Sequence, residues 1–232
     1  MISPALRYAR ANSGITFRPD ANCVLWYPGQ DDAYSTVIRD RSGKGNHGTL
    51  VGTTWSRQSK GLWATLYDGN DYINVPDKAN LDMTTALTLM AWAKQTTVVG
   101  NKFVISKRVE ASDDAYTMQL NAAKYPMMQL YIGGAAKDAI GTTIFPDNTW
   151  TFLCGVYNAT DIRFYFNGVL NCTPTVQAGS IDVTVDPVRI GWGYNATYGW
   201  PGLIALPKIY NRALSAPEIL NHYNQERVLF GV

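Results

Sequence analysis

The sequence has little net charge and no long apolar run. Among its 232 residues, 20 are lysine or arginine and 18 are aspartate or glutamate, which leaves a net charge of +2 at pH 7. No more than two basic residues follow one another, so the basic patch of a nucleic-acid-binding protein is not expected. No apolar stretch approaches the roughly 20 residues that span a bilayer. We therefore expect neither nucleic-acid binding nor membrane insertion.

Cysteine is scarce, and Cys23, Cys154 and Cys172 are far apart in the chain. No C-x-x-C pair occurs, so a zinc or redox site of that type is not expected. Cys154 lies in an apolar run, where a buried and inert thiol is the simplest interpretation. A disulfide between Cys154 and Cys172, across neighbouring strands, is the alternative. The absence of obligatory pairs is typical of a protein made in a reducing compartment.

Residues 1–21 lack both the apolar core of a secretory signal and the periodicity of a helix or strand. We therefore predict no signal peptide and synthesis in the cytoplasm, followed by association with a virus particle or release. The segment is nevertheless too apolar for a plain solvated tail. We predict an N-terminal arm over residues 1–21 that binds neighbouring subunits of an assembly or homo-oligomer. Its apolar residues are Ile2, Leu6, Tyr8, Ile15 and Phe17.

The most informative stretch is residues 40–50, which combine three glycines with several short polar residues. Gly43, Gly45 and Gly48 match the G-x-G-x-x-G spacing of a dinucleotide-binding loop. That motif follows a strand and opens a helix, whereas a β-rich run broken by glycine follows here. Nucleotide binding is therefore not expected. The stretch is interpreted as a loop whose own polar groups satisfy its backbone.

Short runs of alternating apolar residues, separated by glycine and asparagine turns, fill most of residues 23–210. In residues 87–93 the alternation places Leu89 on one face of a strand and Trp92 on the other. Asn167-Gly168 predicts a tight hairpin between two further strands. This pattern predicts an all-β fold of two antiparallel sheets packed as a sandwich.

One short helix is predicted near the C-terminus. Ser215 and Glu218 have the spacing of a capping box, in which each side chain bonds the backbone of the other residue. Ile219, Leu220 and Tyr223 would then form the apolar face of the helix.

Several segments, taken together and in order, resemble a known family. They are Asp40-Arg41-Ser42-Gly43-Lys44-Gly45-Asn46-His47-Gly48 and then residues 67–73, 87–94, 150–157, 163–168, 189–191 and 209–219. The chain is similar to the laminin G-like members of the concanavalin A-like lectin/glucanase superfamily. The resemblance implies a jelly-roll sandwich, which we place at residues 22–232. It is specific for the fold and much less specific for the function.

The resemblance also suggests a structural calcium ion, held by the loop aspartate and an acidic pair in the last strand. The loop aspartate corresponds to Asp40, but Ala205 and Leu206 stand where the acidic pair would be. Calcium prefers six to eight oxygen ligands with several carboxylates. We therefore expect no cofactor, and keep Asp40 as a candidate ligand for a structural calcium.

Glycoside hydrolysis, the reaction that this superfamily makes plausible, needs two carboxyl groups on either side of the scissile bond. Glu110, Glu218 and Glu226 are the only glutamates, and no strand carries two carboxylates at alternate positions. His47 and His222 are the only histidines, and no G-x-S-x-G run accompanies them. We interpret His47 as a hydrogen-bonded core histidine and expect no catalysis.

Residues 191–200 form a loop rich in aromatic residues. Rigid rings offer apolar faces on which sugar rings can stack. Trp200 corresponds to a core aromatic in the family, which leaves the candidate glycan- or partner-binding residues Trp192, Tyr194, Asn195 and Tyr198. Glycan binding, contact with a protein partner and plain packing all remain open for this loop.

The sequence favours a non-catalytic recognition protein. In the first hypothesis the sandwich is a structural subunit that decorates a larger assembly, such as a virus particle, and its partners are other protein subunits. In the second it is a free-standing lectin that binds surface polysaccharide. A glycoside hydrolase or lyase is the third alternative.

Overall fold

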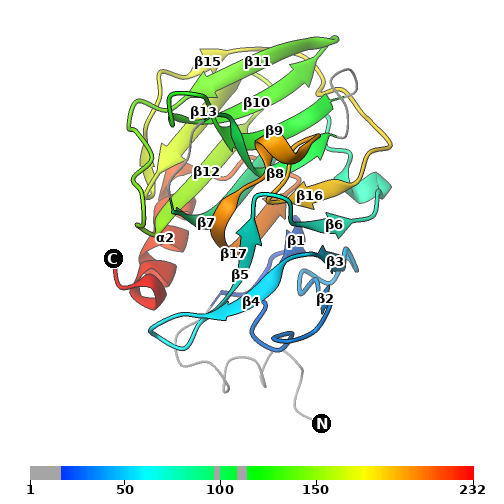
Figure 1. The fold of residues 1–232 in the computed structure, drawn as a ribbon. Helices are drawn as coiled ribbons and strands as arrows, with labels where there is room; N and C mark the ends of the chain where they lie inside the picture. The colour runs from blue at the N-terminus through cyan, green and yellow to red at the C-terminus, as the bar shows by residue number, and fades with distance from the viewer. Residues whose placement is uncertain (1–16, 97–99, 109–113) are drawn as a thin grey trace.

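The structure is a computed structural model that describes residues 17–96, 100–108 and 114–232. Two antiparallel sheets pack face to face, and one long helix lies against the outside of the first sheet (Figure 1). The predicted two-sheet sandwich with a C-terminal helix is therefore confirmed. Of the residue 1–21 segment, only residues 17–21 belong to the described part of the chain.

Within the described residues the first sheet has nine strands. Their order is β14 (Val169–Leu170), β13 (Asp161–Phe166), β12 (Thr151–Tyr157), β7 (Leu87–Gln95), β17 (Pro201–Tyr210), β5 (Trp63–Asp68) and β4 (Thr54–Arg57). Two short strands pair beside this path: β1 (Cys23–Trp26) with β17, and β15 (Thr175–Val176) with β13.

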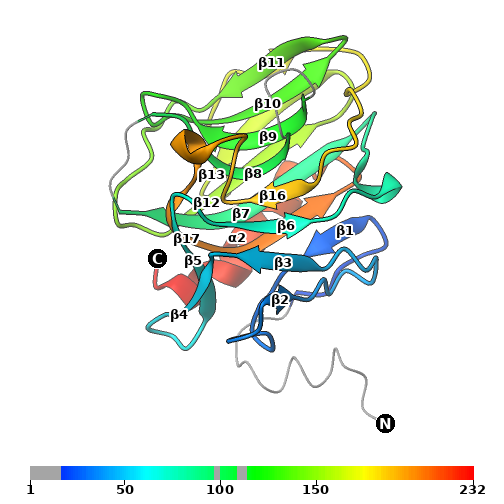
Figure 2. The same cartoon turned by 45° about the vertical axis from the view of Figure 1, so that its right-hand side comes forward.

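The second sheet has eight strands in the described part of the chain. Their order is β11 (Ala135–Ile140), β10 (Pro126–Ile132), β9 (Asp114–Leu120), β8 (Lys102–Arg108), β16 (Val188–Ile190), β6 (Tyr72–Val75), β3 (Gly48–Val51) and β2 (Val37–Ile38). Figure 2 shows β3, β6 and β16 side by side in this layer. The remaining elements are the short 3₁₀ turns η1 (Ala79–Leu81) and η2 (Ala196–Tyr198) and the helix α2 (Ala216–Phe230).

Strand β7 divides the protein into two apolar layers, as its alternation predicts. Leu89 faces the core between the two sheets, whereas Trp92 faces the layer between the nine-stranded sheet and α2. In that second layer the Trp92 ring stacks on Phe230, with ring centroids 4.2 Å apart. The helix is therefore held to the sheet by aromatic packing as well as by chain connection.

The predicted turn and cap are both present. Asn167 and Gly168 have φ of 50° and 79°, the left-handed values that a two-residue hairpin turn requires between β13 and β14. At the start of α2 the backbone N–H of Ser215 donates to Glu218 Oε2 over 2.8 Å, closing the capping box. The predicted apolar face is only partly right, because Ile219 is buried but Leu220 is exposed.

All three cysteines are free, so the alternative of a Cys154–Cys172 disulfide is wrong. Cys154 faces the layer beneath α2, whereas Cys172 packs against the core between the sheets. The two thiols therefore lie on different sides of the nine-stranded sheet. Cys172 Sγ accepts a hydrogen bond from the N–H of Phe164 over 3.1 Å.

Candidate functional site

A row of polar side chains crosses the outer face of the eight-stranded sheet. Cross-strand pairing places one polar residue of each strand directly opposite the next, and paired residues share a face. The neighbouring residues along the same strands, such as Tyr116 and Met128, fill the core instead. We call this set the polar row; from β11 to β3 it consists of Asp138, Gln129, Thr117, Ser106, Arg189, Asn74 and Thr49.

Part of the polar row is buried although it faces away from the core. Ser106 and Thr117 have no exposed surface, and Gln119, two residues further along β9, is nearly as buried. The Oγ1 of Thr117 and the Oε1 of Gln119 have no hydrogen-bond partner among the described residues. A buried polar atom without a partner costs free energy, but neither oxygen has accessible surface that a ligand could contact.

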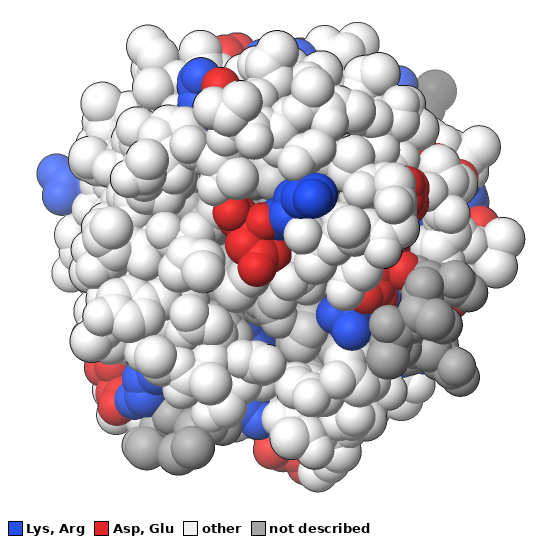
Figure 3. Space-filling model, turned by 90° about the horizontal axis from the view of Figure 1, so that it is seen from above, with Lys and Arg blue, Asp and Glu red and all other residues white. Residues whose placement is uncertain are grey.

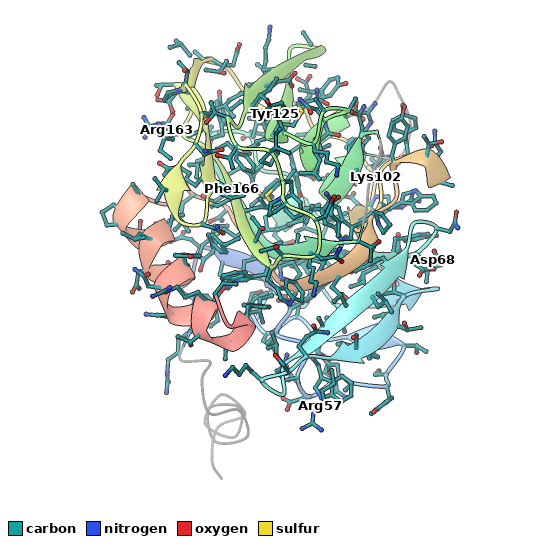
Figure 4. All side chains as sticks on the ribbon, turned by 60° about the vertical axis from the view of Figure 1, so that its left-hand side comes forward. Arg57, Asp68, Lys102, Tyr125, Arg163 and Phe166 are labelled. Atoms are coloured by element: carbon teal, nitrogen blue, oxygen red, sulfur yellow. The ribbon has the colours of Figure 1, made fainter. Side chains whose placement is uncertain are left out.

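The aromatic loop lies beside this row. Its path is fixed by two hydrogen bonds from β8: Ser106 Oγ donates to the carbonyl of Trp192 over 2.6 Å, and Lys102 Nζ donates to the carbonyl of Thr197 over 2.6 Å. Figure 4 shows Lys102 next to this segment. The side chain of Asn195 accepts from the N–H of Thr197 and so caps η2. The loop is therefore held firmly on the outer face of the eight-stranded sheet.

The predicted aromatic residues divide into a core ring and three half-buried rings. Trp200 is fully buried, as the resemblance implies. Tyr194 and Tyr198 lie with ring centroids 4.5 Å apart, and the Tyr198 ring meets the edge of Phe103 at 5.7 Å. Trp192 lies apart from these two and contacts Tyr72 at 5.4 Å. The structure thus brings Tyr194, Asn195 and Tyr198 together and places Trp192 in a neighbouring contact.

Arg108 links the aromatic loop to the sheet. Its guanidinium carbon lies 4.5 Å from the ring centroid of Tyr194 and 5.9 Å from that of Tyr131. Its Nε is 2.8 Å from a carboxylate oxygen of Asp114. Because Arg108 and Asp114 are both nearly buried, this pair is well shielded from water. The cation, the two rings and the carboxylate form one compact group at the end of β8.

Burial raises the pKa of the Tyr131 hydroxyl, and the carboxylate of Asp114 raises it further. Both effects disfavour the phenolate, so Tyr131 keeps its proton at neutral pH and can donate it in a hydrogen bond. The hydroxyl of Tyr198 likewise raises the pKa of Tyr194. The site therefore offers neutral hydroxyls, one guanidinium and apolar rings.

Figure 3 shows one face of the molecule, where acidic and basic side chains form small mixed groups in a mostly uncharged surface.

The carboxylate of Asp40 is fully hydrogen-bonded to neighbouring groups of the protein. Its carboxylate accepts hydrogen bonds from the N–H of Trp26, the N–H and hydroxyl of Ser42 and the N–H of Asn46, at 2.7–3.0 Å. Its own N–H donates to Nδ1 of His47. His47 is thus hydrogen-bonded as predicted, but the prediction of a core position is wrong because its ring is exposed.

Lys107 occupies a cage made entirely of oxygen atoms. Its Nζ lies 2.6 Å from Asp77 Oδ1 and 3.0 Å from Asp82 Oδ1, and it donates to the carbonyls of Thr184 and Asp186 at 2.6 and 3.0 Å. The side chain is completely buried. Carboxylate and carbonyl oxygens in this arrangement are the ligands that calcium prefers, and here an ammonium group neutralises them.

The two described glutamates have structural partners. Glu218 closes the capping box and bonds Arg212 over 2.7 Å. Glu226 is buried beneath α2, where Lys208 Nζ lies 2.5 Å from Oε1 and the indole N–H of Trp92 donates to Oε2 over 2.8 Å. Glu110 falls in residues 109–113, outside the described part of the chain. Neither described glutamate is free to act as an acid or base.

A small pocket lies between the start of the chain and α2. It has a volume of about 250 Å³, and its lining includes Phe17, Tyr210, Arg212 and His222. Phe17 meets the edge of Trp26 at 4.7 Å, and Lys208 Nζ lies 5.1 Å from the centre of its ring. Phe17 therefore lies on its own domain. The other predicted arm residues, Ile2, Leu6, Tyr8 and Ile15, lie outside the described residues.

The comparisons with known proteins agree with this geometry. The profile of the family described as the concanavalin A-like lectin/glucanases superfamily matches residues 67–220, about two thirds of the chain. The chain belongs to this superfamily. The matched region contains the aromatic loop, Arg108 and most of the polar row. A comparison with curated sequences found no match.

Several solved structures share the fold at low identity. The binding domain of Paraclostridial Mosquitocidal Protein 1 is 16% identical with a TM-score of 0.70, over 88% of this chain and 52% of that one. Domain 4 of an extracellular arabinanase from Geobacillus stearothermophilus, in complex with arabinotriose, is 17% identical with a TM-score of 0.69. That match covers 87% of this chain and 98% of the arabinanase domain.

A third similar structure is the receptor-binding domain of botulinum neurotoxin mosaic serotype C/D, which is 16% identical with a TM-score of 0.68. The match covers 88% of this chain and 51% of the toxin domain. The superfamily domain described here thus spans about half the length of the toxin domains and nearly all of the arabinanase domain.

The structural calcium suggested by the superfamily does not fit the residues present. The carboxylate of Asp40 is already filled by four donors, and Ala205 and Leu206 are buried in an irregular part of β17. The described residues hold no cluster of three or more histidine, cysteine or acidic side chains that could bind a metal. No helix among them is long and apolar enough to cross a membrane.

Reasoning from sequence missed most of this site. The polar row was visible as alternation, since Thr117 and Gln119 alternate with Tyr116, Met118 and Leu120 in β9. Alternation alone does not say which face a ligand could reach. Arg108 gave no signal, because its neighbours Tyr131 and Tyr194 are distant in the chain.

Proposed function

We propose that the protein is a non-catalytic, lectin-like recognition domain that binds a glycan between the aromatic loop and the polar row. The observation that carries this proposal is the Arg108 group: a guanidinium flanked by the rings of Tyr194 and Tyr131 and held by Asp114. Aromatic rings pack against the apolar faces of sugar rings, while guanidinium, amide and hydroxyl groups bond the sugar hydroxyls.

The similar structures support this class of ligand. Domain 4 of the Geobacillus arabinanase is in complex with arabinotriose, and a similar botulinum neurotoxin binding domain is in complex with SialylT. At 12–17% identity these likenesses do not name the sugar for this chain. They make a saccharide the first class of ligand to test.

The decisive experiment compares glycan binding by the unchanged protein and by a Tyr194→Ala/Tyr198→Ala variant on a broad panel of immobilised glycans. Each lost aromatic contact is worth about 0.5–1.5 kcal/mol, so the double variant should bind about tenfold or more weakly. Val228→Ala is the matched control, because Val228 is 59% exposed on α2, which covers the nine-stranded sheet and not the sheet that carries the site. Unchanged glycan binding by a folded double variant would contradict the proposal.

The absence of catalysis is part of the same proposal. Asp114 is paired with Arg108, and Asp138 accepts a hydrogen bond from Gln129 over 2.8 Å. A glycosidase needs one carboxyl group free to give up a proton and a second to attack or to activate water. We expect no release of reducing ends from a polysaccharide panel. Turnover that disappears in Asp114→Asn or Asp138→Asn would show that the domain is an enzyme.

We also propose, as the second candidate, that the domain is a subunit of a larger assembly such as a virus particle. The apolar residues at positions 2–15 support it, as do Val183 and Val185, which are exposed in the segment between β15 and β16. Apolar side chains presented to solvent are suited to a protein contact. Mass measurement by light scattering and electron microscopy of the full chain test this candidate, since a monomer under all conditions would contradict it.

A further inference from the structure

A second group of aromatic rings lies apart from the Arg108 group, at the start of β5 and on its neighbour β4. Trp55 on the edge strand β4 and Trp63 on β5 share one face of the sheet, because Trp55 pairs with Thr65 and Trp63 with Arg57. Tyr34 meets Trp63 edge to face, with ring centroids 5.2 Å apart. We call these three rings the edge platform. None of the three rings belongs to the glycine-rich stretch at residues 40–50 or to the aromatic loop.

Tyr34 has an unusual backbone and an unusual exposure. Its φ of 71° lies in the left-handed region, which a bulky side chain rarely adopts. Its side chain is 83% exposed, so burial of the ring does not account for the conformation. Strained residues persist where the surroundings impose them, and they are concentrated at binding and catalytic sites. The strain here holds an aromatic ring out into solvent.

The surroundings of Tyr34 are rigid. The side chain of Gln30 bonds both backbone groups of Trp63: its Oε1 accepts from the N–H over 2.8 Å, and its Nε2 donates to the carbonyl over 3.0 Å. The indole N–H of Trp55 donates to the carbonyl of Ser35 over 2.8 Å. The loop that carries Tyr34 is thus fixed to both β4 and β5 before any ligand arrives, which lowers the entropic cost of binding.

We infer that the edge platform is a second saccharide-binding site, on which a sugar ring stacks against Tyr34. The ligand class rests on the proposed function, and the location rests on the edge platform alone. Charged side chains lie close to Tyr34 in the chain: Asp31 and Arg41 lie 3.3 Å apart, and the exposed Arg39 pairs with Asp32 over 3.5 Å. One exposed ring in a segment that also carries carboxylate and guanidinium groups suits a ligand with an apolar face and many hydroxyls. A protein partner would need a broader apolar surface.

The two sites are joined by strand β5. Trp63 begins the strand, Asp68 ends it, and the turn after Asp68 touches the aromatic loop, since a Cβ at Gly199 would meet the carbonyl of Gly69. Figure 4 shows Arg57, the partner of Trp63, and Asp68 at the two ends of this region. Five steps of about 3.3 Å separate the ends by roughly 17 Å. A glycan chain that reaches both sites would bind with higher apparent affinity than either site alone.

Nuclear magnetic resonance of the tryptophan indole groups can test each site separately. The chain has seven tryptophans, and Trp→Phe variants assign the signals of Trp63 and Trp192. The probes are arabinotriose, cellotriose, maltotriose and sialyllactose at millimolar concentration. We expect one of them to shift the Trp63 signal, and Tyr34→Ala to weaken that titration at least tenfold. Leu66→Ala, a 41% exposed residue on the opposite face of β5, should change it less than twofold.

Two further variants separate the ring from the backbone strain. Tyr34→Gly removes the ring and the backbone strain, and should lose sugar binding as Tyr34→Ala does. Tyr34→Trp keeps an aromatic ring at this position and should retain sugar binding. If sugars shift Trp192 but never Trp63, the edge platform is not a saccharide site and the proposed function stands. If they shift Trp63 alone, the inference holds and the Arg108 group is wrongly assigned. A Trp63 titration that Tyr34→Ala leaves unchanged, or a protein partner bound at Tyr34 with no sugar response, overturns the inference.

Discussion

Lys208 Nζ and Glu226 Oε1 lie 2.5 Å apart in the layer between the nine-stranded sheet and α2, where both side chains are almost completely buried. The pair joins β17 to the helix across 18 residues of chain. Because the pair lies under the helix, removing either partner would leave the charge of the other buried and without its ion-pair partner.

The first prediction follows from this pair. Lys208→Met or Glu226→Gln should lower the free energy of unfolding by about 3–5 kcal/mol, because each leaves one buried group unpaired. The double variant Lys208→Met/Glu226→Leu should recover much of the loss. Asp147→Asn is the control, since its ion pair with Lys124 is partly exposed and should contribute about 1 kcal/mol or less. Urea unfolding measures all four, and equal effects at the two pairs would contradict the prediction.

The second prediction concerns acid. The hydrogen bond from Arg212 lowers the pKa of Glu218 from 4.5 to about 2. A carboxyl group whose pKa is lowered in the folded state stabilises the protein above pH 4.5, and that contribution disappears as the pH falls toward 2. Burial alone would raise the pKa of Glu226, but Lys208 and His222 lower it below its usual value, so it acts in the same direction.

Unfolding free energies measured between pH 7 and pH 2 should therefore fall most steeply below about pH 4.5. Glu218→Gln keeps the capping geometry but cannot titrate, so its stability should depend less on pH in that window. A steeper acid dependence in this variant than in the unchanged protein would show that the sign is wrong.

The third prediction tests the extent of the arm. Deleting residues 1–16 should leave the melting temperature unchanged. Deleting residues 1–20 also removes the contacts of Phe17 with Trp26 and Lys208 and the ion pair of Asp20 with Arg212. The half-buried ring alone is worth about 1–2 kcal/mol. In a domain of this size that is a loss of several degrees in melting temperature. The arm boundary at residue 21 stays a prediction until both deletions are compared by calorimetry.

The fourth prediction concerns metal. Because the ammonium of Lys107 fills its oxygen cage, a chelator should leave the melting temperature of the unchanged protein unaltered. Lys107→Ala should be strongly destabilised and should regain stability when calcium is added, since the cage then holds two carboxylates without a cation. Leu66→Ala should show no response to calcium. A chelator effect on the unchanged protein would reveal a metal site elsewhere.

Sequence reasoning was accurate for strand alternation, for the hairpin turn and for the helix cap. The alternation in β7, the Asn167-Gly168 turn and the Ser215 cap each depend on residues close together in the chain, and all three are confirmed. The core position that the resemblance implies for Trp200 is also confirmed. These features are set by backbone preference and side-chain period, which a sequence states directly.

The rest of the site depends on contacts between distant segments. The buried role of Glu226 depends on Lys208 of β17 and Trp92 of β7. Neither the backbone strain of Tyr34 nor its contact with Trp63 can be inferred from the local sequence. Only the pairing of strands brings such residues together.

The polar row has a consequence for how a preparation of this protein would behave. A slip of one residue in β9 or β10 would turn an apolar side chain outward in place of the polar one. Thr117 would give way to Tyr116 or Met118, and Gln129 to Met128 or Leu130. Molecules with a misregistered sheet would therefore lack the ligand surface while remaining compact. Retention on an immobilised ligand would count the correctly paired molecules, which a measurement of secondary-structure content cannot do.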